Sequence, residues 1–258
     1  MKSVIAFLFL LFLSPNDYQT FLKKGDELHK KFDNINAAKQ YEEAYKLAPG
    51  DYYVLQKLTM VYNDLGEEYV ELSRRSDEEK GKSLREEAKK YIDKAIHYAE
   101  LLQKKFPDSA DVYTYLALSY GNIAMFRGSK EKIKLAHQVK DNAVKALQMN
   151  PDNYIAYVIL GIYNREVGNL SFLERLFANA FFGDVPEGSF EEAIEMFNKA
   201  LKILPNTIVP TYGLARTYRY MGEYEKEKEM LQKVLKYKVQ NFRDKFAIEK
   251  AKRRLKEM

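Results

Sequence analysis

The chain has 258 residues, no cysteine and no tryptophan, and its 42 basic and 37 acidic side chains give a formal net charge of +5. The absence of cysteine excludes disulfides, thiol nucleophiles and thiolate metal sites. The positive charge is too small to require a polyanion, so we expect no nucleic-acid partner. Strand and hairpin signals are nearly absent, and 31% charged residues suit helices with one solvated face. We therefore expect an all-α protein.

The first 15 residues have the pattern of a secretory signal peptide or short N-terminal anchor. Lys2 supplies the basic start, and residues 4–13 form an apolar run that Ser14 and Pro15 end. Such a run has the length of a signal core and is shorter than the roughly 20 residues that span a bilayer. We predict an exported protein, periplasmic or secreted. No small-x-small cleavage site follows, which leaves an uncleaved membrane tether or a buried first helix as alternatives.

From residue 16 onward, a spacing of small, aromatic and proline residues recurs five times. Its first instance is Gly25, Ala37, Tyr41, Ala44 and Pro49. The small residues let two helices approach closely, the larger ones fill the space between them, and proline stops each unit. A period of about 34 residues is typical of the tetratricopeptide repeat. We predict one domain over 16–258, a right-handed helical-hairpin solenoid of about five tetratricopeptide-like repeats.

Two insertions interrupt the repeats, and the first covers residues 67–83. This charged stretch is expected to extend the preceding helix or to form a solvated loop, followed by a long helix over 84–106. Capping boxes are predicted at the start of two second helices, where Ser83 precedes Glu86 and Ser189 precedes Glu192.

The second insertion, residues 169–189, contains an apolar stripe at helical spacing. We predict a short helix that Phe182 and Gly183 end, with its apolar face packed into the groove of the array or against neighbouring helices. The alternative is an element that contacts a membrane or covers a ligand. The candidate residues of this insertion helix are Phe172, Arg175, Phe177, Phe181 and Phe182. At the C-terminus, a basic helix over 243–257 is expected to be a solvated cap of the array.

No catalytic or metal constellation is recognisable. His29, His97 and His137 fall on different expected helices, without the spacing of metal ligands. Nucleotide-binding glycine motifs are absent. Ser129 and Lys132 match the pattern Ser-x-x-Lys, but none of the motifs that accompany it in serine enzymes is present. We therefore expect no catalytic residue, no metal and no cofactor.

The concave groove of the array is the expected binding surface, because the first helix of each repeat lines it in this fold. Three arginines gather toward one end, where they could pair with a carboxylate or a phosphate. Glu166 and Glu223 lie nearby in sequence and could neutralise them. The candidate groove residues are Tyr53, Asn63, Asn122, Arg165, Tyr212, Arg216 and Arg219.

The second insertion and the helix after it also carry a family resemblance. Residues 170–205, LSFLERLFANAFFGDVPEGSFEEAIEMFNKALKILP, resemble the regulator of microtubule dynamics family in an aromatic-acidic-basic stretch, a glycine, a proline, a serine and an alanine-containing helix that ends in proline. The resemblance covers about 130–258 and, more loosely, 30–130. The matching residues are Leu170, Ser171, Phe172, Glu174, Arg175, Ala178, Phe182, Gly183, Pro186, Ser189, Ala193, Phe197, Ala200 and Pro205.

The resemblance implies a helical-repeat adaptor rather than an enzyme. Animal members of the family are associated with microtubules and organelle membranes, and the repeat domain of one member binds phospholipid. The signal-like N-terminus indicates an exported prokaryotic relative, so the cytoskeletal partner is not carried over. We expect a non-enzymatic scaffold that binds an unknown protein segment in its groove, in the cell envelope. The alternative is a carrier of a lipid or another small hydrophobic ligand.

Overall fold

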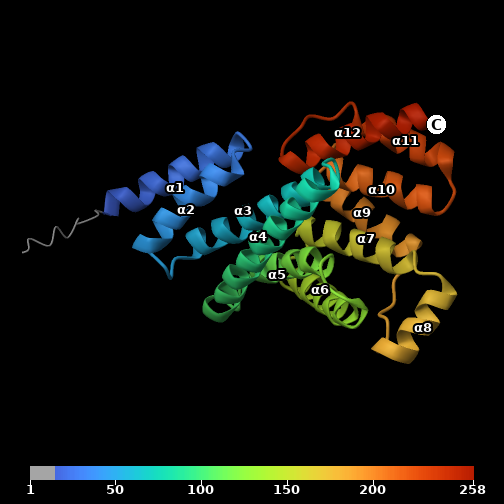
Figure 1. Cartoon of the computed structure of the whole chain (residues 1–258), viewed down its shortest axis with the longest axis horizontal. Coiled ribbons are helices and arrows are strands. Elements are labelled where there is room, and N and C mark those ends of the chain that lie inside the picture. Colours follow the sequence, from blue (N-terminus) through green and yellow to red (C-terminus); the bar gives the residue numbers. More distant parts are fainter. Residues whose placement is uncertain (1–14) are drawn as a thin grey trace, which may run out of the picture.

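The computed structural model describes residues 15–258, and this part of the chain folds into twelve α-helices (Figure 1). The predicted signal run at 4–13 lies outside the described residues. Within 15–258, no helix combines the length and the apolar character needed to cross a membrane. The helices are α1 (Pro15–Lys30), α2 (Asn34–Leu47), α3 (Tyr52–Ser73), α4 (Glu78–Lys105), α5 (Ala110–Ala124), α6 (Ser129–Met149), α7 (Tyr154–Gly168), α8 (Phe172–Phe182), α9 (Phe190–Ile203), α10 (Ile208–Tyr220), α11 (Tyr224–Val234) and α12 (Phe242–Glu257).

Ten of these helices form five hairpins that stack side by side, which confirms the predicted all-α repeat array. The pairs are α1 with α2, α3 with α4, α5 with α6, α7 with α9, and α10 with α11. Helix α8 is inserted between the two helices of the fourth hairpin and projects from the array (Figure 1). Helix α12 follows the fifth hairpin and contacts both α10 and α11.

The recurring spacing in the sequence corresponds to close contacts inside each hairpin. A Cβ atom at Gly25 would lie 2.4 Å from the ring of Tyr41, which is fully buried in the first hairpin. In the fourth hairpin, a Cβ atom at Gly161 would lie 2.6 Å from the ring of Phe197. Both distances are far below van der Waals contact, so only glycine lets the large ring lie flat against the facing helix. The fully buried alanines of the second helices are Ala37, Ala44, Ala88, Ala95, Ala99, Ala143, Ala146, Ala193 and Ala200.

The first insertion is helical for most of its length, and one predicted cap is wrong. Helix α3 continues to Ser73, and α4 then begins at Glu78 rather than at residue 84. The side chain of Asp77 caps α4 by accepting a hydrogen bond from the backbone nitrogen of Lys80 at 2.9 Å. Ser83 therefore lies within α4, because the carboxylate of Asp77 offers a cap earlier in the chain.

The second predicted cap is confirmed at the start of α9. The Ser189 hydroxyl accepts from the backbone nitrogen of Glu192 at 3.1 Å, and the Glu192 carboxylate accepts from the backbone nitrogen of Ser189 at 3.1 Å. This reciprocal pair satisfies two donors that the first turn of a helix leaves without intrahelical partners. It also fixes the point at which the chain returns from the inserted segment to the repeat array.

The array curves so that its C-terminal helix meets its second hairpin. The N-terminal part of α12 lies against the C-terminal half of α3, although more than 170 residues separate them (Figure 1). We call this contact the α3–α12 closure. It places α12 beside the concave side of the array, where the groove residues were predicted.

Candidate functional site

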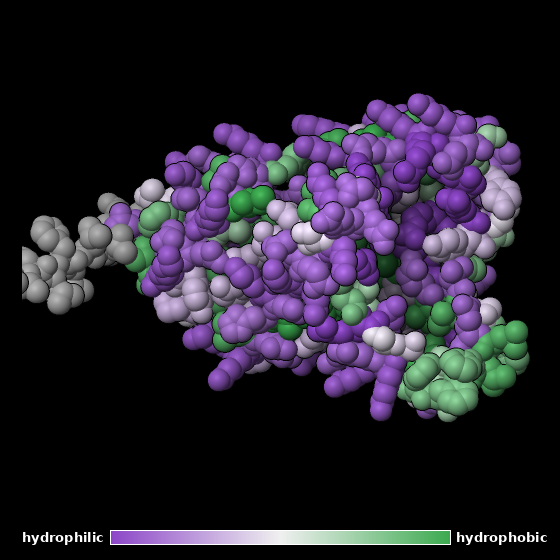
Figure 2. Space-filling view, in the orientation of Figure 1, coloured by the Kyte–Doolittle hydropathy of each residue, from purple (hydrophilic) through white to green (hydrophobic). Residues whose placement is uncertain are grey.

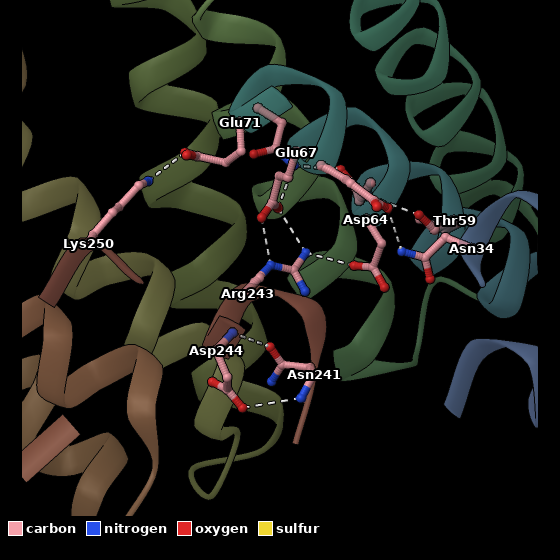
Figure 3. Close-up of polar contacts among 12 residues, drawn as sticks. Asn34, Thr59, Asp64, Glu67, Glu71, Asn241, Arg243, Asp244 and Lys250 are labelled. Atoms are coloured by element: carbon pink, nitrogen blue, oxygen red, sulfur yellow. Dashed lines mark hydrogen bonds and ion pairs between the residues drawn. The ribbon is translucent and has the colours of Figure 1, made fainter. Parts of the chain in front are cut away.

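The α3–α12 closure is held by ion pairs between an acidic face of α3 and a basic face of α12 (Figure 3). Arg243 lies 2.8 Å from an oxygen of Asp64 through Nη2 and 2.6 Å from an oxygen of Glu67 through Nε. One helical turn further along α3, Glu71 lies 2.6 Å from Nζ of Lys250. The acidic residues recur every three or four positions, which places them on one face of α3.

Burial and neighbouring charges act in opposite directions on this cluster. Burial alone would raise the pKa of the Asp64 carboxyl group, but Arg243 and His29 outweigh it and hold that pKa below its ordinary value of 3.8. Burial likewise opposes the charge of Arg243, while Glu67 and Asp64 outweigh it and raise the pKa of the guanidinium. Both partners therefore remain charged near neutral pH.

The prediction that the C-terminal helix is a solvated basic cap is consequently wrong for three of its cations. Arg243 and Lys250 face α3, and Arg254 forms two hydrogen bonds to the buried carboxylate of Glu227 at 2.8 and 3.0 Å. The physical reason is that α12 meets acidic side chains from both α3 and α11. Among residues 15–258, the helix still leaves Lys252 and Arg253 exposed.

Two of the predicted groove residues, Asn63 and Asn122, join α3 to α5 rather than facing an open groove. The fully buried Asn63 donates to the hydroxyl of Ser119 at 2.8 Å. The side-chain amide of Asn122 donates to the side-chain oxygen Oδ1 of Asn63 at 2.9 Å and to the carboxylate of Glu67 at 3.0 Å. Because Glu67 also binds Arg243, this network connects the α3–α5 contact to the closure.

Arg165 is also withdrawn from the surface, since only 2% of it is exposed. Its Nε and Nη2 atoms donate to one oxygen of Glu166 at 3.1 and 2.8 Å, and its guanidinium lies 6.0 Å from the ring centroid of Phe197. Burial lowers the pKa of Arg165. Glu166 therefore neutralises Arg165 as the sequence suggested, whereas Glu223 pairs with Lys226 instead.

A cleft of about 270 Å³ opens between α10 and α12, and we call it the basic cleft. It collects three predicted groove residues, namely Tyr212, Arg216 and Arg219, and adds cations from α12. Tyr53, in contrast, lies at the start of α3, 62% exposed and in edge contact with Tyr52. The complete lining of the basic cleft is Tyr212, Arg216, Arg219, Glu227, Leu231, Lys250, Arg253, Arg254 and Glu257.

The cations of the basic cleft differ in how far they are neutralised. Lys250 pairs with Glu71, and Arg254 pairs with Glu227. Arg216 donates to the hydroxyl of Tyr220 at 2.8 Å and lies 3.5 Å from Glu166. Within residues 15–258, Arg219 and Arg253 take part in no ion pair, and both are exposed.

Two arginines therefore remain available to an anion in this cleft. A planar guanidinium can bind a carboxylate or phosphate through two parallel hydrogen bonds.

Sequence reasoning missed Lys250 and Arg253 because the last helix was interpreted only as a cap. A usable signal was present: Arg243 and Lys250 are seven residues apart, hence on one helical face, and Asp64, Glu67 and Glu71 form an acidic face of matching spacing. Complementary stripes of this kind indicate a contact between two helices. Their separation of more than 170 residues hides it from local patterns.

The predicted insertion helix forms, but its apolar face is not covered. Phe172, Phe177 and Phe181 are 77%, 56% and 68% exposed, and α8 contains no buried residue. Phe182 is partly buried, and Arg175 points toward the array. The expectation that this face packs into the groove or against neighbouring helices is therefore wrong. Hydrophobic side chains gather over α8 at the lower right of Figure 2.

The histidines lie on three separate helices, as expected. His29 belongs to α1, His97 to α4 and His137 to α6. Over the described range 15–258, no three histidine, aspartate or glutamate side chains come together in a way that could hold a metal ion. The described part of the chain thus offers the basic cleft and α8 as its two unusual surfaces.

Comparison with solved structures shows the repeat fold. A thermophilic TPR protein of Thermus thermophilus matches with a TM-score of 0.63 and 17% sequence identity, over 91% of this chain and 98% of that chain. PilW, described as a widely conserved type IV pilus biogenesis factor, matches with a TM-score of 0.55 and 16% identity, over 86% of this chain and 78% of that one. At these identities the likeness concerns the fold alone.

Comparison of sequences shows the family. Regulator of microtubule dynamics protein 1 of Mus musculus is 25% identical over 188 residues, which cover 71% of this chain and 58% of that protein. Regulator of microtubule dynamics protein 3 of Xenopus laevis is 27% identical over 209 residues, which cover 78% of this chain and 41% of that protein. The chain thus spans about half the length of these curated relatives. The family model for regulator of microtubule dynamics proteins 1–3 matches residues 21–258. The chain therefore belongs to the regulator of microtubule dynamics family.

Proposed function

We propose that this chain is a non-enzymatic repeat scaffold whose basic cleft holds an acidic segment of a partner protein. The observation that carries the proposal is the pair of exposed arginines in that cleft, Arg219 and Arg253, which have no acidic partner within residues 15–258. The fold supports it, because arrays of helical hairpins present extended surfaces to protein segments.

The shape and chemistry of the basic cleft favour a small number of carboxylates rather than a polyanion. Its volume of about 270 Å³ accommodates one or two acidic side chains or a C-terminal carboxylate. Tyr212 and Leu231 add apolar contacts beside the cations. Glu227 and Glu257 line the same cleft and would repel a densely charged chain. The ligand class is therefore a mixed acidic and apolar peptide segment.

The test uses variants of the two unpaired arginines. An immobilised full-length chain should capture a defined set of partners from native extract, and the strongest of them is then titrated against each variant. We expect R219A/R253A to weaken this binding by at least about tenfold, since charge-assisted hydrogen bonds contribute roughly 1.5–3 kcal/mol each. The matched control is K252A, because Lys252 is exposed on α12 and does not line the cleft. Equal affinity of R219A/R253A and K252A would refute the assignment.

The scaffold is proposed to act outside the cytoplasm, as an exported prokaryotic protein of the periplasm or the secreted fraction. The support is the basic start and apolar run of residues 2–13, which have the length of a signal peptide. Cell fractionation followed by N-terminal sequencing of the mature protein tests this point. Recovery in the cytoplasm with an intact N-terminus would contradict export, and recovery in the membrane with an intact N-terminus would indicate the tether.

A second candidate function, carriage of a lipid or small hydrophobic ligand, is favoured by two apolar residues of α7. Ile155 and Ile162 are 41% and 40% exposed and lie seven residues apart, on one face of the helix. An acyl chain would cover such a stripe. Native mass spectrometry of the purified chain checks for a co-purifying lipid, and substitution of both isoleucines by serine should remove it. A protein that carries no lipid before or after substitution would count against this candidate.

A further inference from the structure

Helix α8 is attached to the array by its polar side. Arg175 donates to the backbone oxygens of Pro186 at 3.2 Å and Val167 at 3.1 Å. Asn179 accepts from the backbone nitrogen of Val185 at 2.7 Å. An amphipathic helix on the surface of a folded domain usually turns its apolar face toward the core. In α8 the orientation is reversed, so burial in this protein's own core does not explain the apolar face.

The outward face of α8 carries five large apolar side chains, which we call the apolar patch. They expose roughly 600 Å², at about 180 Å² for a fully exposed side chain of this size. A patch of this area is at the upper end of what a monomer presents and marks an interaction site. Figure 2 shows the patch as a continuous hydrophobic surface over α8. Its members, with exposed fractions, are Phe172 (77%), Leu173 (74%), Leu176 (55%), Phe177 (56%) and Phe181 (68%).

Positive charge borders the apolar patch on the side of α6. Lys130 and Lys134 are exposed, lie four residues apart on one face of α6, and line a hollow together with Phe182 and Gly183 at the end of α8 and with the acidic Asp184 that follows. Neither lysine has an acidic partner within ion-pair distance among residues 15–258. Glu131, between them in sequence, is engaged by Arg127 at 3.0 Å. The two lysines are therefore free to bind anionic groups beside the patch.

We propose that α8 is a membrane-contact helix, which inserts the apolar patch into the interfacial region of a lipid bilayer while Lys130 and Lys134 bind anionic headgroups. An apolar helical face that carries several phenylalanines and is flanked by cations has the composition of an interfacial helix. The helix projects from the array (Figure 1), and a lipid surface can cover a projecting helix without needing a complementary groove.

A second copy of the chain fits the apolar patch less well. A stable protein interface buries about 800 Å² on each partner, and the patch supplies roughly 600 Å². The unpaired lysines at its border would also be brought toward each other in a symmetric pair, because both copies present the same surface. A lipid bilayer that contains anionic headgroups would cover the apolar patch and also supply negative charge to the two lysines. This site shares no residue with the basic cleft, so either proposal can fail alone.

The lack of tryptophan allows a probe placed at the patch itself. We substitute Phe177→Trp in the full-length chain, with Tyr224→Trp as the control, because Tyr224 is 56% exposed on α11. On addition of mixed phosphatidylcholine and phosphatidylserine vesicles, the emission of F177W should shift to shorter wavelength and be quenched by brominated acyl chains. The emission of Y224W should not change. This readout reports on α8 even where residues 1–14 also bind the vesicles.

Sedimentation with vesicles measures the two contributions separately. F172S/F177S/F181S should lower partitioning by about a hundredfold or more, because interfacial binding scales with the apolar area that is buried. K130Q/K134Q should lower partitioning to phosphatidylserine vesicles by about twenty-fivefold, at about fivefold for each lysine, and should leave partitioning to pure phosphatidylcholine vesicles unchanged. Y224S serves as the control for loss of an exposed aromatic ring.

Two outcomes would overturn the proposal. The first is vesicle binding with no change in F177W emission, since another part of the chain would then contact the lipid. The second is an F177W blue shift that grows with protein concentration in the absence of vesicles and resists brominated lipid. That result would assign the apolar patch to an interface between two copies of the chain.

Discussion

The α3–α12 closure predicts a specific loss of stability when Arg243 is replaced by methionine. Methionine keeps much of the side-chain volume but removes the charge that binds Asp64 at 2.8 Å and Glu67 at 2.6 Å. Both carboxylates are largely buried, with 10% and 20% of their side chains exposed. The variant therefore leaves two negative charges close together without their shared cation.

The magnitude follows from what each carboxylate retains. Breaking a fully buried pair by removing one partner costs about 3–5 kcal/mol. Here Asp64 keeps His29 at 2.7 Å, and Glu67 keeps the amide of Asn122 at 3.0 Å. We therefore expect the free energy of unfolding to fall by about 2–3 kcal/mol, at or just below the lower limit of that range. For a chain of this size, the melting temperature should fall by roughly 5–10 °C.

Urea denaturation followed by circular dichroism measures this loss, and hydrogen exchange locates it. The faster exchange in R243M should be concentrated in α12 and in the second half of α3. K252A is the matched control, because Lys252 is an exposed cation of the same helix. In an E67Q background, where one of the two charges is already gone, the cost of R243M should shrink by about 1 kcal/mol or more, the size of coupling between directly contacting groups.

Two results would refute the reasoning. If R243M unfolds at the same urea concentration as K252A, the closure contributes nothing to stability. If instead R243M is destabilised equally in the E67Q background and in the original chain, Arg243 acts through some contact other than the carboxylates of α3.

Three further outcomes follow from single residues. The pKa of Asp64 is held below 3.8 in the folded protein, so its stabilising contribution is lost only as the pH falls below about 4. The urea midpoints of the wild type and D64N should therefore differ by a constant amount near neutral pH and approach each other below about pH 4. Gly161→Ala would place a methyl group 2.6 Å from the ring of Phe197 and should destabilise the chain by about 1–3 kcal/mol in the same assay. An unchanged urea midpoint would show that the two helices of the fourth hairpin can move apart without cost. Ser189→Ala removes the cap at Glu192 and should cost about 1 kcal/mol, with faster amide exchange confined to the first turn of α9.

The repeat array could be predicted because each hairpin is specified by residues close in sequence. Gly25 and Tyr41, like Gly161 and Phe197, are complementary in size across two helices that a short connection or one insertion separates. Such contacts leave a periodic trace that one sequence displays. The misplaced start of α4 had a local cause, since Asp77 and Ser83 are both good caps and only the structure selects Asp77.

The two surfaces of functional interest could be predicted only in part. Periodicity identified the apolar face of α8, but the direction in which that face points depends on the contacts of Arg175 with Pro186 and Val167. Likewise, Arg216 and Arg219 were found from their positions in the fifth repeat, whereas Lys250 and Arg253 join them only because α12 folds back over α10. Both features depend on how segments are oriented relative to each other, and local patterns do not record this.

The closure and the basic cleft share one residue, and this couples stability to binding. Lys250 lines the cleft and is held 2.6 Å from Glu71 of α3, so the position of α12 against α3 also sets the position of a cleft cation. A ligand that binds only the closed arrangement must stabilise it by the free energy of binding. Reciprocally, any change that opens the closure must weaken the binding of that ligand, because only the molecules that remain closed can bind it. Arg243 does not line the cleft, yet through this linkage R243M should bind the proposed acidic segment more weakly than the wild type, which titration of the same ligand against both proteins would measure.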